Sequence, residues 1–448
     1  MKKNINIVCN EDINNNRLNY VIDFINNHPL KPLGVKLFLN VNLNDSDIIY
    51  YTNENVQGKI IPLQNLFFSN KKIPQVNLFA NEYLLGDEKY YSVEKIKKLS
   101  YFFNVENVFA FDIFETIFFH ISRYEEYFFS KNHLDKHGRM KSSEQLLVKT
   151  KLHYIPVVDH LVYGFFKILN FDMEKRKTDY TLTHDIDIIR KFSGFLKLPK
   201  SIARILLMGY GIKGVYNIVN SYFQSLKNKN NDPYYTFEWL FRKEDYFINK
   251  IVFFVAGGNT RQDLYNKYYL KELPEIIRKA KINNYEIGLH PSYNAYADEK
   301  MLKTEQELLL NFTKRRIKFI RMHFLRLDLT KSFEIIENIG FEMDSTLGYN
   351  DTIGFRAGTG FEYYPYNFGE ERKWKFKELP LIIMDSALLK NCKGNPDCFE
   401  EKLIEFLKLN KFNTHICFNF HNSTFDSNKS LHKIRVFYQN IFDSDLNN

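Results

Sequence analysis

The chain has 448 residues, of which 44% are hydrophobic and 26% are charged. This length exceeds the roughly 100–200 residues of a typical domain and predicts two domains or one large barrel with an extension, while the composition excludes disordered, collagen-like and low-complexity chains. The 62 Lys and Arg residues outnumber the 53 Asp and Glu residues, which gives a formal net charge of +9, but no aromatic-basic platform accompanies this charge and we expect no nucleic-acid partner.

The N-terminus and the cysteines indicate the compartment. The opening sequence, MKKNINIVCNEDINNN, has two lysines but lacks an apolar segment of about 7–15 residues, so we expect no signal peptide. No run of about 18 apolar residues occurs, and we expect no transmembrane helix. Cys9, Cys392, Cys398 and Cys417 lack metal-knuckle spacing, which argues against a disulfide scaffold and a structural zinc finger. We therefore expect a cytoplasmic protein in a reducing compartment.

The first part of the chain predicts small α/β units. The strands are expected at residues 4–8, 35–39, 47–51 and 58–63, and a helix at 18–27. Apolar residues then recur at helical spacing over 112–129, whose charged end, SRYEEYFF, we expect at the surface. The stretch 170–177 interrupts the apolar pattern. It predicts a boundary between an N-terminal α/β accessory domain, residues 1–175, and a second domain, residues 176–448.

Seven short apolar runs follow, and nearly all end in a polar cluster: DYTLTHDID, KIVFFVAGG, YEIGLHPS, KFIRMHF, GFEMDST, ELPLIIMD and HICFNFHN. Helical stretches separate most of them, including one that carries Phe333, Ile336 and Ile339 on one face and stops at Gly340. Strands that alternate with helices predict a parallel sheet, here a closed or nearly closed α/β barrel with its ligands at the carboxyl ends of the strands.

A basic insertion separates the first two of these runs. Residues 188–231 contain no acidic residue and carry eight Lys or Arg residues. Their Leu, Ile and Tyr content predicts amphipathic helices that contact an anionic membrane surface or a charged polymer. A solvated helical insertion is the alternative.

Polar residues at the ends of the runs form the candidate site. They are Asp185, Asp187, His290, Arg321, His323, Asp344, Asp385 and His421. Because strand ends of a barrel converge at one rim, these carboxylates and histidines suggest metal-assisted hydrolysis. One histidine at one strand end is more often structural, as we expect for His184, which alternates to the opposite face of its strand.

The order THDID, GLHPSYN, RMHF, DST and FNFHN resembles the NodB-type polysaccharide deacetylase family, which is related to carbohydrate esterase family 4. The resemblance covers roughly residues 176–425. The runs SRYEEYFF, DKHGRM, DPYYTFEWL, GLHPSY and FRAGT are similar to a subfamily with an extra N-terminal domain. The resemblance implies a deformed (β/α)7-type barrel with a smaller N-terminal α/β domain. It also implies removal of N-acetyl groups from an amino-sugar glycan or a lipid-linked sugar precursor.

The resemblance also implies a metal site. Asp187 and His290 match metal ligands of the family, but Asn294 stands where the family has a second histidine four residues later. Either Asn294 or His323 would complete the site. The implied cofactor is one divalent metal ion, zinc first, with cobalt, nickel or manganese as alternatives.

The remaining site roles also come from the resemblance. Asp185 matches the general base and Arg321 the arginine that orients it, while His421 matches the general acid, held by Asp344 or Asp385. Two further residues are expected to contact substrate. They are Tyr293, which would stack on a sugar face, and Arg356, whose alternative is a salt bridge that anchors a loop.

Two other functions remain open. The barrel could bind a glycan or a partner protein without catalysis, because the second histidine of the family motif is lost. It could also hydrolyse a small or cyclic amide instead of a sugar, because a fold does not fix a function.

Overall fold

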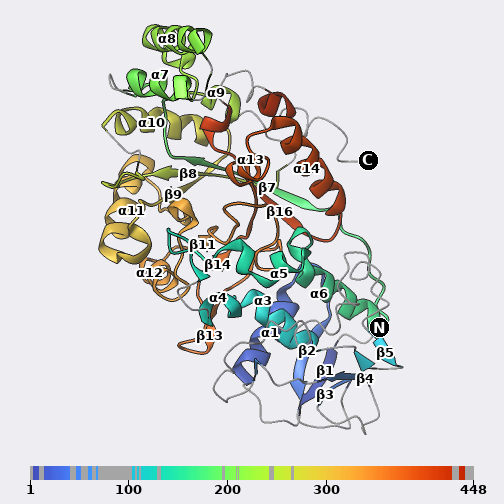
Figure 1. The fold of residues 1–448 in the computed structure, drawn as a ribbon. Coiled ribbons are helices and arrows are strands. Elements are labelled where there is room, and N and C mark those ends of the chain that lie inside the picture. The colour runs from blue at the N-terminus through green and yellow to red at the C-terminus, as the bar shows by residue number, and fades with distance from the viewer. Residues whose placement is uncertain are drawn as a thin grey trace. The chain divides into compact units, whose positions relative to one another are not determined.

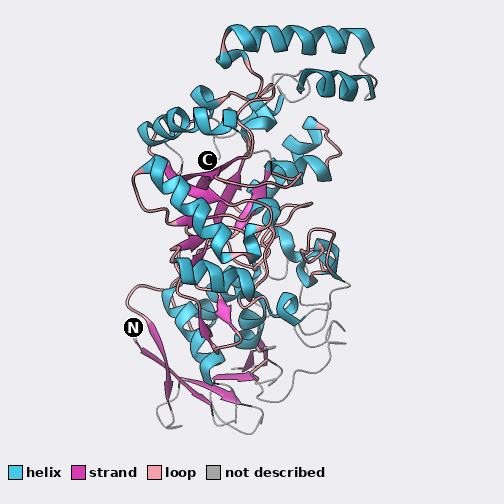
Figure 2. Cartoon of the chain, turned by 90° about the vertical axis from the view of Figure 1, so that its left-hand side faces the viewer, coloured by secondary structure: helices cyan, strands magenta, loops and turns pink. Residues whose placement is uncertain are grey.

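The structure is a computed structural model, drawn as a ribbon in Figure 1 and coloured by secondary structure in Figure 2. Internal contacts divide the chain into two compact units. Unit 1 comprises Met1–Thr178, Gly354–Ile382 and Leu409–Ile416, and unit 2 comprises Asp179–Ile353, Ile383–Lys408 and Cys417–Asn448. The division into domains 1–175 and 176–448 stays a prediction. The described residues are 4–9, 15–40, 47–51, 59–62, 67–68, 103–105, 108–109, 112–128, 133–193, 197–207, 209, 211–241, 247–263, 267–425 and 433–438.

Unit 1 contains a six-stranded sheet in the order β2-β1-β3-β4-β6-β5. Strand β1 pairs in parallel with β2 and β3, and β3 with β4, whereas β5 and β6 are antiparallel. The strands are β1 (Asn4–Cys9), β2 (Lys36–Asn40), β3 (Ile48–Tyr51), β4 (Lys59–Pro62), β5 (Phe103–Val105) and β6 (Val108–Phe109). A separate antiparallel pair consists of β12 (Tyr366–Asn367) and β13 (Arg372–Lys373). The four strands predicted in the first 63 residues are confirmed as β1 to β4.

The helices of unit 1 share one hydrophobic core with the sheet. They are α1 (Asn15–Asn27), α3 (Ile113–Ile121), α4 (Tyr124–Phe128), α5 (Leu146–Lys149) and α6 (Val157–Ile168). Leu18 and Val21 of α1, Phe118 of α3 and Phe165 of α6 are completely buried in this core, together with Ile7 of β1. The predicted helix at 18–27 is confirmed as α1.

The predicted helix over 112–129 is divided in two, and its charged end is not at the surface. Asp112 caps α3 by accepting a hydrogen bond from the Glu115 backbone N–H, and Arg123, with φ of 56°, separates α3 from α4. Arg123 is only 1% exposed, and its buried guanidinium donates hydrogen bonds to Gln145 and to the neighbouring Glu126. A buried charge is tolerated only when it is paired. The surface prediction for SRYEEYFF is therefore wrong; Phe129 lies outside the described residues.

A curled eight-stranded sheet confirms the predicted α/β fold class, a deformed half-barrel. Most of its residues belong to unit 2, but strand residues 377–378, 381–382 and 415–416 are grouped with unit 1. The strand order is β14-β11-β10-β9-β8-β7-β16-β15, and the pairings from β7 to β11 are all parallel. The strands are β7 (Asp179–Ile186), β8 (Asn249–Val255), β9 (Glu286–His290), β10 (Phe319–Ile320), β11 (Met343–Asp344), β14 (Lys377–Glu378), β15 (Leu381–Met384) and β16 (His415–Asn419). Each of the seven predicted apolar runs contains one of these strands.

Helices connect the strands, as parallel pairing requires. They are α7 (Lys197–Leu207), α8 (Gly211–Lys227), α9 (Phe237–Leu240), α10 (Lys267–Ile282), α11 (Glu299–Thr313), α12 (Lys331–Ile339), α13 (Asp385–Asn391) and α14 (Pro396–Leu409). Figure 1 shows α10, α11 and α12 following one another beside β8 to β11. Helix α12 ends at Gly340, whose φ of 84° suits glycine, as predicted. Short 3-10 turns include η6 (Lys229–Asn231), η7 (Ala295–Ala297), η8 (His323–Leu325) and η9 (Asn422–Phe425).

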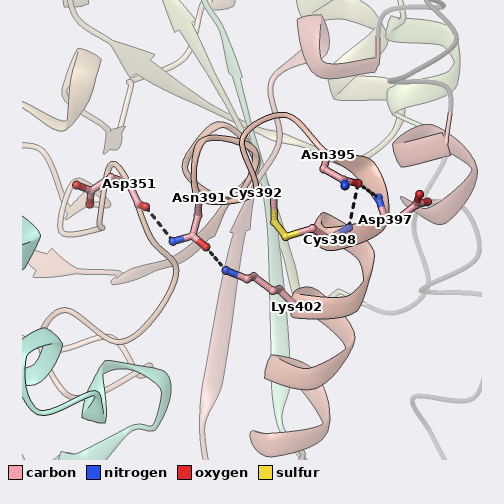
Figure 3. The surroundings of a disulfide bond; sticks show 7 residues. All are labelled: Asp351, Asn391, Cys392, Asn395, Asp397, Cys398 and Lys402. Carbon is pink, nitrogen blue, oxygen red and sulfur yellow. Dashed lines mark hydrogen bonds between the residues drawn. A yellow bond between two sulfur atoms is a disulfide. The ribbon is translucent and has the colours of Figure 1, made fainter.

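A disulfide joins Cys392, at the end of α13, to Cys398 in α14 (Figure 3). The two Cα atoms are 5.6 Å apart, because the chain reverses through Lys393 and Gly394, both at positive φ. Asn395 Oδ1 accepts hydrogen bonds from the backbone N–H groups of Asp397 and Cys398 and fixes the start of α14. Sequence spacing alone did not predict this bridge. It differs from the expectation of a reducing compartment, in which disulfides are rare.

Candidate metal centre and active site

The register of the parallel strands brings the predicted site residues to one edge of the sheet in unit 2. Asp185 lies opposite Phe253 of β8, His290 opposite Val255, and Asp344 of β11 opposite Ile320 of β10. The carboxyl ends of β7, β9 and β10 are thus close together. Asp187 directly follows β7, His290 is the last residue of β9, and His323 lies shortly after β10. Strand geometry therefore explains why residues more than 100 positions apart in the sequence meet.

Asp187, His290 and His323 form a group that could hold a metal ion, since one ligand atom from each lies within 4.8 Å of the others. Asp187 Oδ1 is 3.2 Å from His290 Nε2 and 3.8 Å from His323 Nε2. Ligands about 2.0–2.1 Å from a tetrahedral ion lie roughly 3.3 Å from each other, so the spacing fits. Asp187 Oδ1 is buried without a hydrogen-bond partner among the described residues, as a carboxylate oxygen reserved for a cation would be.

His290 is fixed by the backbone. Its Nδ1–H donates to the Arg321 carbonyl at 2.7 Å, which leaves the lone pair of Nε2 directed away from that carbonyl. A hydrogen bond to the second ring nitrogen is the usual way in which proteins orient a metal-binding histidine. Burial disfavours a charged Asp187, but His290, His323 and His421 together hold its pKa well below the usual range.

His323 reaches this group through an unusual turn. Immediately after it, Phe324 and Leu325 have φ of 61° and 52°, a conformation that non-glycine residues rarely adopt. The turn brings the His323 ring to within 4.9 Å of the His290 ring centroid. Backbone strain of this kind concentrates at functional sites.

Asn294, the alternative ligand in the sequence, has a different environment. It is exposed in the turn before η7, and its side-chain oxygen lies 3.4 Å from the guanidinium of Arg326, which donates to it. Arg326 stacks on the Tyr293 ring at 3.9 Å and donates to the Tyr293 carbonyl. The structure thus brings His323 to Asp187 and His290, while Asn294 and Tyr293 share a contact with Arg326.

Asp263 is a site residue that the sequence analysis missed. Its side chain is 1% exposed, and its Oδ1 lies 3.5 Å from His323 Nδ1, on the opposite side of the ring from Asp187. The carboxylate also accepts bonds from the backbone N–H groups of Tyr293 and Thr260, at 2.9 and 3.0 Å. A side chain at Gly258 would collide with it, because a Cβ there would lie 2.4 Å from the Asp263 carboxyl carbon. The glycine pair after β8 was the available sequence signal.

Asp185 is held by Arg321 and by a second missed residue, Asn419. Arg321 donates to Asp185 Oδ1 at 2.9 Å, and the Asn419 amide donates to Oδ2 at 2.8 Å. Arg321 is completely buried and also donates to Thr183 and Ser345. Burial alone would raise the pKa of Asp185, but the positive charges of Arg321, His290 and His421 together outweigh burial, and the pKa is lowered.

His421 is paired with Asp385 and not with Asp344. Asp385 accepts from His421 Nδ1 at 2.6 Å and from the His421 backbone N–H at 2.7 Å. Burial opposes the charged imidazole, but Asp385, with smaller effects from Asp187 and Asp185, raises the pKa of His421 to about 10. Asp344 instead accepts a hydrogen bond from the Thr346 hydroxyl, so its predicted role as the partner of His421 is corrected.

The remaining predicted residues lie elsewhere. Arg356 belongs to unit 1, where its guanidinium pairs with Glu126 at 2.6 Å, the anchoring contact that the sequence left as an alternative. His184 is bound to the backbone, as expected for a structural histidine: its Nδ1 lies 2.9 Å from the Phe420 carbonyl oxygen, and burial lowers its pKa to about 4.

Comparison with known proteins gives a family match and distant fold likenesses. A family of unknown function, DUF7033, matches residues 6–174. No curated protein matches the chain. The solved structures with similar folds include a proposed polysaccharide deacetylase from Mycobacterium smegmatis, with 14% identity, a TM-score of 0.35, and coverage of 61% of this chain and 87% of that one.

Two further solved structures have similar values. Puue allantoinase shares 12% identity over 60% of this chain and 85% of its own, with a TM-score of 0.33. A pseudoenzyme of the CE4 family from Bacillus anthracis shares 6% identity over 62% of this chain and 66% of its own, with a TM-score of 0.29. Likenesses at these values concern the fold alone and do not indicate the function of this chain.

Proposed function

We propose that this chain is a metal-dependent hydrolase that removes N-acetyl groups from an amino-sugar glycan or a lipid-linked sugar precursor. One observation carries the proposal. His421 Nε2 lies 3.8 Å from Asp187 Oδ2 and 4.0 Å from Asp185 Oδ2, so a proton donor, a proton acceptor and a cation-binding group face one common space.

The ligand types favour a divalent transition metal. Two imidazole nitrogens and one carboxylate oxygen are a ligand set typical of catalytic zinc sites, which keep a further position for water or substrate. Cobalt, nickel and manganese accept similar ligands. When bound, such an ion supplies Lewis acidity, which lowers the pKa of water and polarises an acyl carbonyl.

Asp185 is the proposed proton acceptor. Attack of water on an amide carbonyl releases a proton, and a carboxylate near the attacking oxygen accelerates the reaction by accepting it. Arg321 and Asn419 fix both oxygens of Asp185 and keep it ionised before each turnover. Because both oxygens of Asp185 are engaged by Arg321 and Asn419, Asp187 is the carboxylate that remains available to the metal.

His421 is the proposed proton donor. Cleavage of the C–N bond expels an amine, which leaves only after it gains a proton. Asp385 holds the imidazole by two hydrogen bonds and keeps it charged near neutral pH. In one turnover, Asp185 takes one proton from water and His421 gives one to the sugar nitrogen, the C–N bond breaks, and acetate and the amino sugar leave. Asp185 then releases its proton and His421 regains one, so both residues return to their starting states.

The test combines metal analysis with acetate release from N-acetylglucosamine oligomers. We expect one transition-metal ion per chain, lost in His290→Ala, and acetate release that falls by about 10²–10⁴-fold in Asp185→Asn and in His421→Ala. Circular dichroism should show that these variants are folded. Metal retained at full stoichiometry by His290→Ala, or unchanged acetate release by either acid-base variant, would contradict the proposed roles.

The same protein, assayed also with a small cyclic amide and for retention on an immobilised glycan, separates the alternatives. Metal binding with hydrolysis of a small cyclic amide but of no sugar amide would identify an amidase. Metal binding and glycan retention without hydrolysis of either substrate would identify a non-catalytic binding protein.

A further inference from the structure

We propose that the helical hairpin formed by α7 and α8 binds the surface of a bilayer that contains anionic phospholipids, with α8 lying flat along the interface. The two helices pack on each other within the basic insertion, and Figures 1 and 2 both show them side by side. The inference rests on the hairpin alone and goes beyond the proposed function.

Helix α8 has two apolar faces, and only one of them is covered. Ile218 and Tyr222 are buried against Phe192, with Leu198 and Ile202 packed around them. A second stripe, displaced around the helix, consists of large apolar residues that remain exposed: Ile212 by 88%, Tyr216 by 69%, Phe223 by 55% and Leu226 by 62%.

The exposed residues form a continuous surface. Their spacing of 4, 7 and 3 residues places all four along one line of a helix with 3.6 residues per turn. Leu206 and Leu207, at the end of α7, add two further exposed apolar side chains to the hairpin and are 55% and 89% exposed. Contiguous apolar patches on a folded surface mark contact with a partner or a membrane. We call these six residues the apolar stripe.

The charges around the apolar stripe have one sign. No acidic residue occurs between Ile188 and Asn231, and Lys197, Lys200, Lys213 and Lys227 form no ion pair with any acidic residue that the structure describes. An apolar face beside unpaired lysines matches the two parts of an anionic bilayer surface, the acyl boundary and the headgroups. A second protein copy would bring the same positive charges together, which disfavours a dimer through this face.

Two other basic residues have a structural role at the base of the hairpin. Arg190 pairs with Glu272 at 2.5 Å, and Lys229 pairs with Glu275, so both ends of the insertion are fastened to α10. Asp232 accepts from the backbone N–H groups of Lys191 and Phe192 and closes the base. The base of the hairpin is therefore fastened to α10, and the lysines of α7 and α8 remain available to lipid.

The length of the stripe indicates how the hairpin would lie. Residues 212–226 span about 21 Å along the helix axis at 1.5 Å per residue. An apolar line of this length contacts the membrane along its whole extent only if the helix is parallel to the surface. None of the described helices is long and apolar enough to cross a bilayer, which agrees with interfacial contact.

The base of the hairpin adjoins the candidate site. The Asn422 amide donates to the carbonyls of Ile188, where the basic insertion begins, and Tyr234, just after it ends, at 2.8 Å each. Asn422 follows His421 directly, and Ile188 follows Asp187. Attachment of α8 to a bilayer would thus hold the site next to the membrane surface, where lipid-linked molecules lie.

The experiment is sedimentation of the full chain with vesicles of phosphatidylcholine alone or with 30% phosphatidylglycerol. We expect binding to the anionic vesicles at low salt, weak binding to neutral vesicles, and loss of binding at high salt through screening. The variant Lys200→Gln/Lys213→Gln/Lys227→Gln should bind roughly 100-fold more weakly, since one lysine near an anionic surface is worth about fivefold. The matched control is Lys300→Gln/Lys303→Gln/Lys408→Gln, which removes equal charge from exposed positions outside the hairpin and should bind normally.

The apolar stripe has its own test. Leu207→Ser/Ile212→Ser/Phe223→Ser should weaken binding, whereas Ile282→Ser/Leu310→Ser, at exposed apolar positions outside the hairpin, should not. In a Tyr216→Trp variant, tryptophan emission should shift to the blue on anionic vesicles and be quenched by brominated acyl chains. Absence of binding at low salt, equal binding by the hairpin and control variants, or a vesicle-independent dimer abolished by the serine substitutions would overturn the proposal.

Discussion

Single residues around the third ligand position distinguish this site from the family pattern that the sequence resembles. Where the pattern has a second histidine after β9, this chain has Asn294, and the second imidazole beside Asp187 is that of His323 after β10. The turn at Phe324 and Leu325 and the carboxylate of Asp263 support this arrangement from two sides. We infer that the turn and Asp263 hold the His323 ring beside Asp187 and His290, a position that strand β10 alone would not give it.

Asp263 provides a direct test of this inference. Asp263→Asn removes the negative charge that faces His323 Nδ1 while keeping a side chain of the same size. Loss of a carboxylate behind a metal-binding histidine typically lowers metal affinity by 10–100-fold, and we expect a decrease in that range, measured by competition with a chromophoric chelator. Asp298→Asn, at the exposed N-cap of α11, is the matched control. Equal metal affinity in Asp263→Asn and wild type would show that Asp263 only shapes the loop.

Glu305 of α11 predicts a pH dependence of stability. It is buried and accepts hydrogen bonds from the Ser292 backbone N–H and hydroxyl, near the end of β9. Burial raises its pKa to about 7 from the ordinary 4.5, although the Ser292 hydrogen bonds oppose the shift. Between these two values the folded state binds more protons than the unfolded state, so the free energy of unfolding falls as pH rises, by on the order of 3 kcal/mol in total.

The variant Glu305→Gln isolates this effect, because glutamine resembles the protonated side chain and can donate to the Ser292 hydroxyl. We expect it to be more stable than wild type at pH 7.5 and similar at pH 4.5, in urea unfolding followed across this range. Glu307→Gln, exposed on the same helix, should leave the pH profile unchanged. A wild-type profile that is flat between pH 4.5 and 7 would exclude the raised pKa.

At the scale of elements, the bridge between α13 and α14 stabilises a region that carries a site residue. Asp385, the partner of His421, is the first residue of α13, and Cys392 follows the last. Lys402 donates to Asn391, so the end of α13 is also tied to α14 by a hydrogen bond (Figure 3). The position of Asp385 therefore depends on contacts at the opposite end of its helix.

The expected contribution of the disulfide follows from its short loop. Closing a loop between residues six positions apart constrains the unfolded chain by roughly 2 kcal/mol, so Cys392→Ser/Cys398→Ser should lower the free energy of unfolding by about this amount. Dithiothreitol should produce the same change in wild type and none in the double variant. Peptide mass spectrometry without reductant should find Cys392 linked to Cys398; free thiols at both positions after aerobic purification would refute the pairing.

At the scale of the whole molecule, the chain does not divide at one point. Residues 354–382 and 409–416 group with the first 178 residues, while the segments before and after them belong to unit 2. Arg356 shows the consequence, because its position near the barrel motifs in the sequence suggested a substrate contact, yet its guanidinium pairs with Glu126. Where a chain passes more than once between two units, a residue that is near a motif in the sequence need not lie near that motif in space.

The sequence by itself determined the elements of the barrel and most of the residues at their ends. Apolar runs and helical periodicity are local properties, and they predicted β7 to β11, β15 and β16 and the helices between them. It also determined that Asp187, His290 and His421 are close together, because parallel strands in one sheet have their carboxyl ends on the same edge.

Only the tertiary structure decided whether His323 or Asn294 lies beside Asp187 and His290. It also decided whether Asp385 or Asp344 pairs with His421. It alone showed Asp263 and Asn419 at the site and Arg123 in the core. The physical reason is the same for each residue. A strand end fixes where a side chain starts, whereas its partner depends on strand register, on the φ angles of the following turn and on which distant carboxylate or amide fills the remaining space.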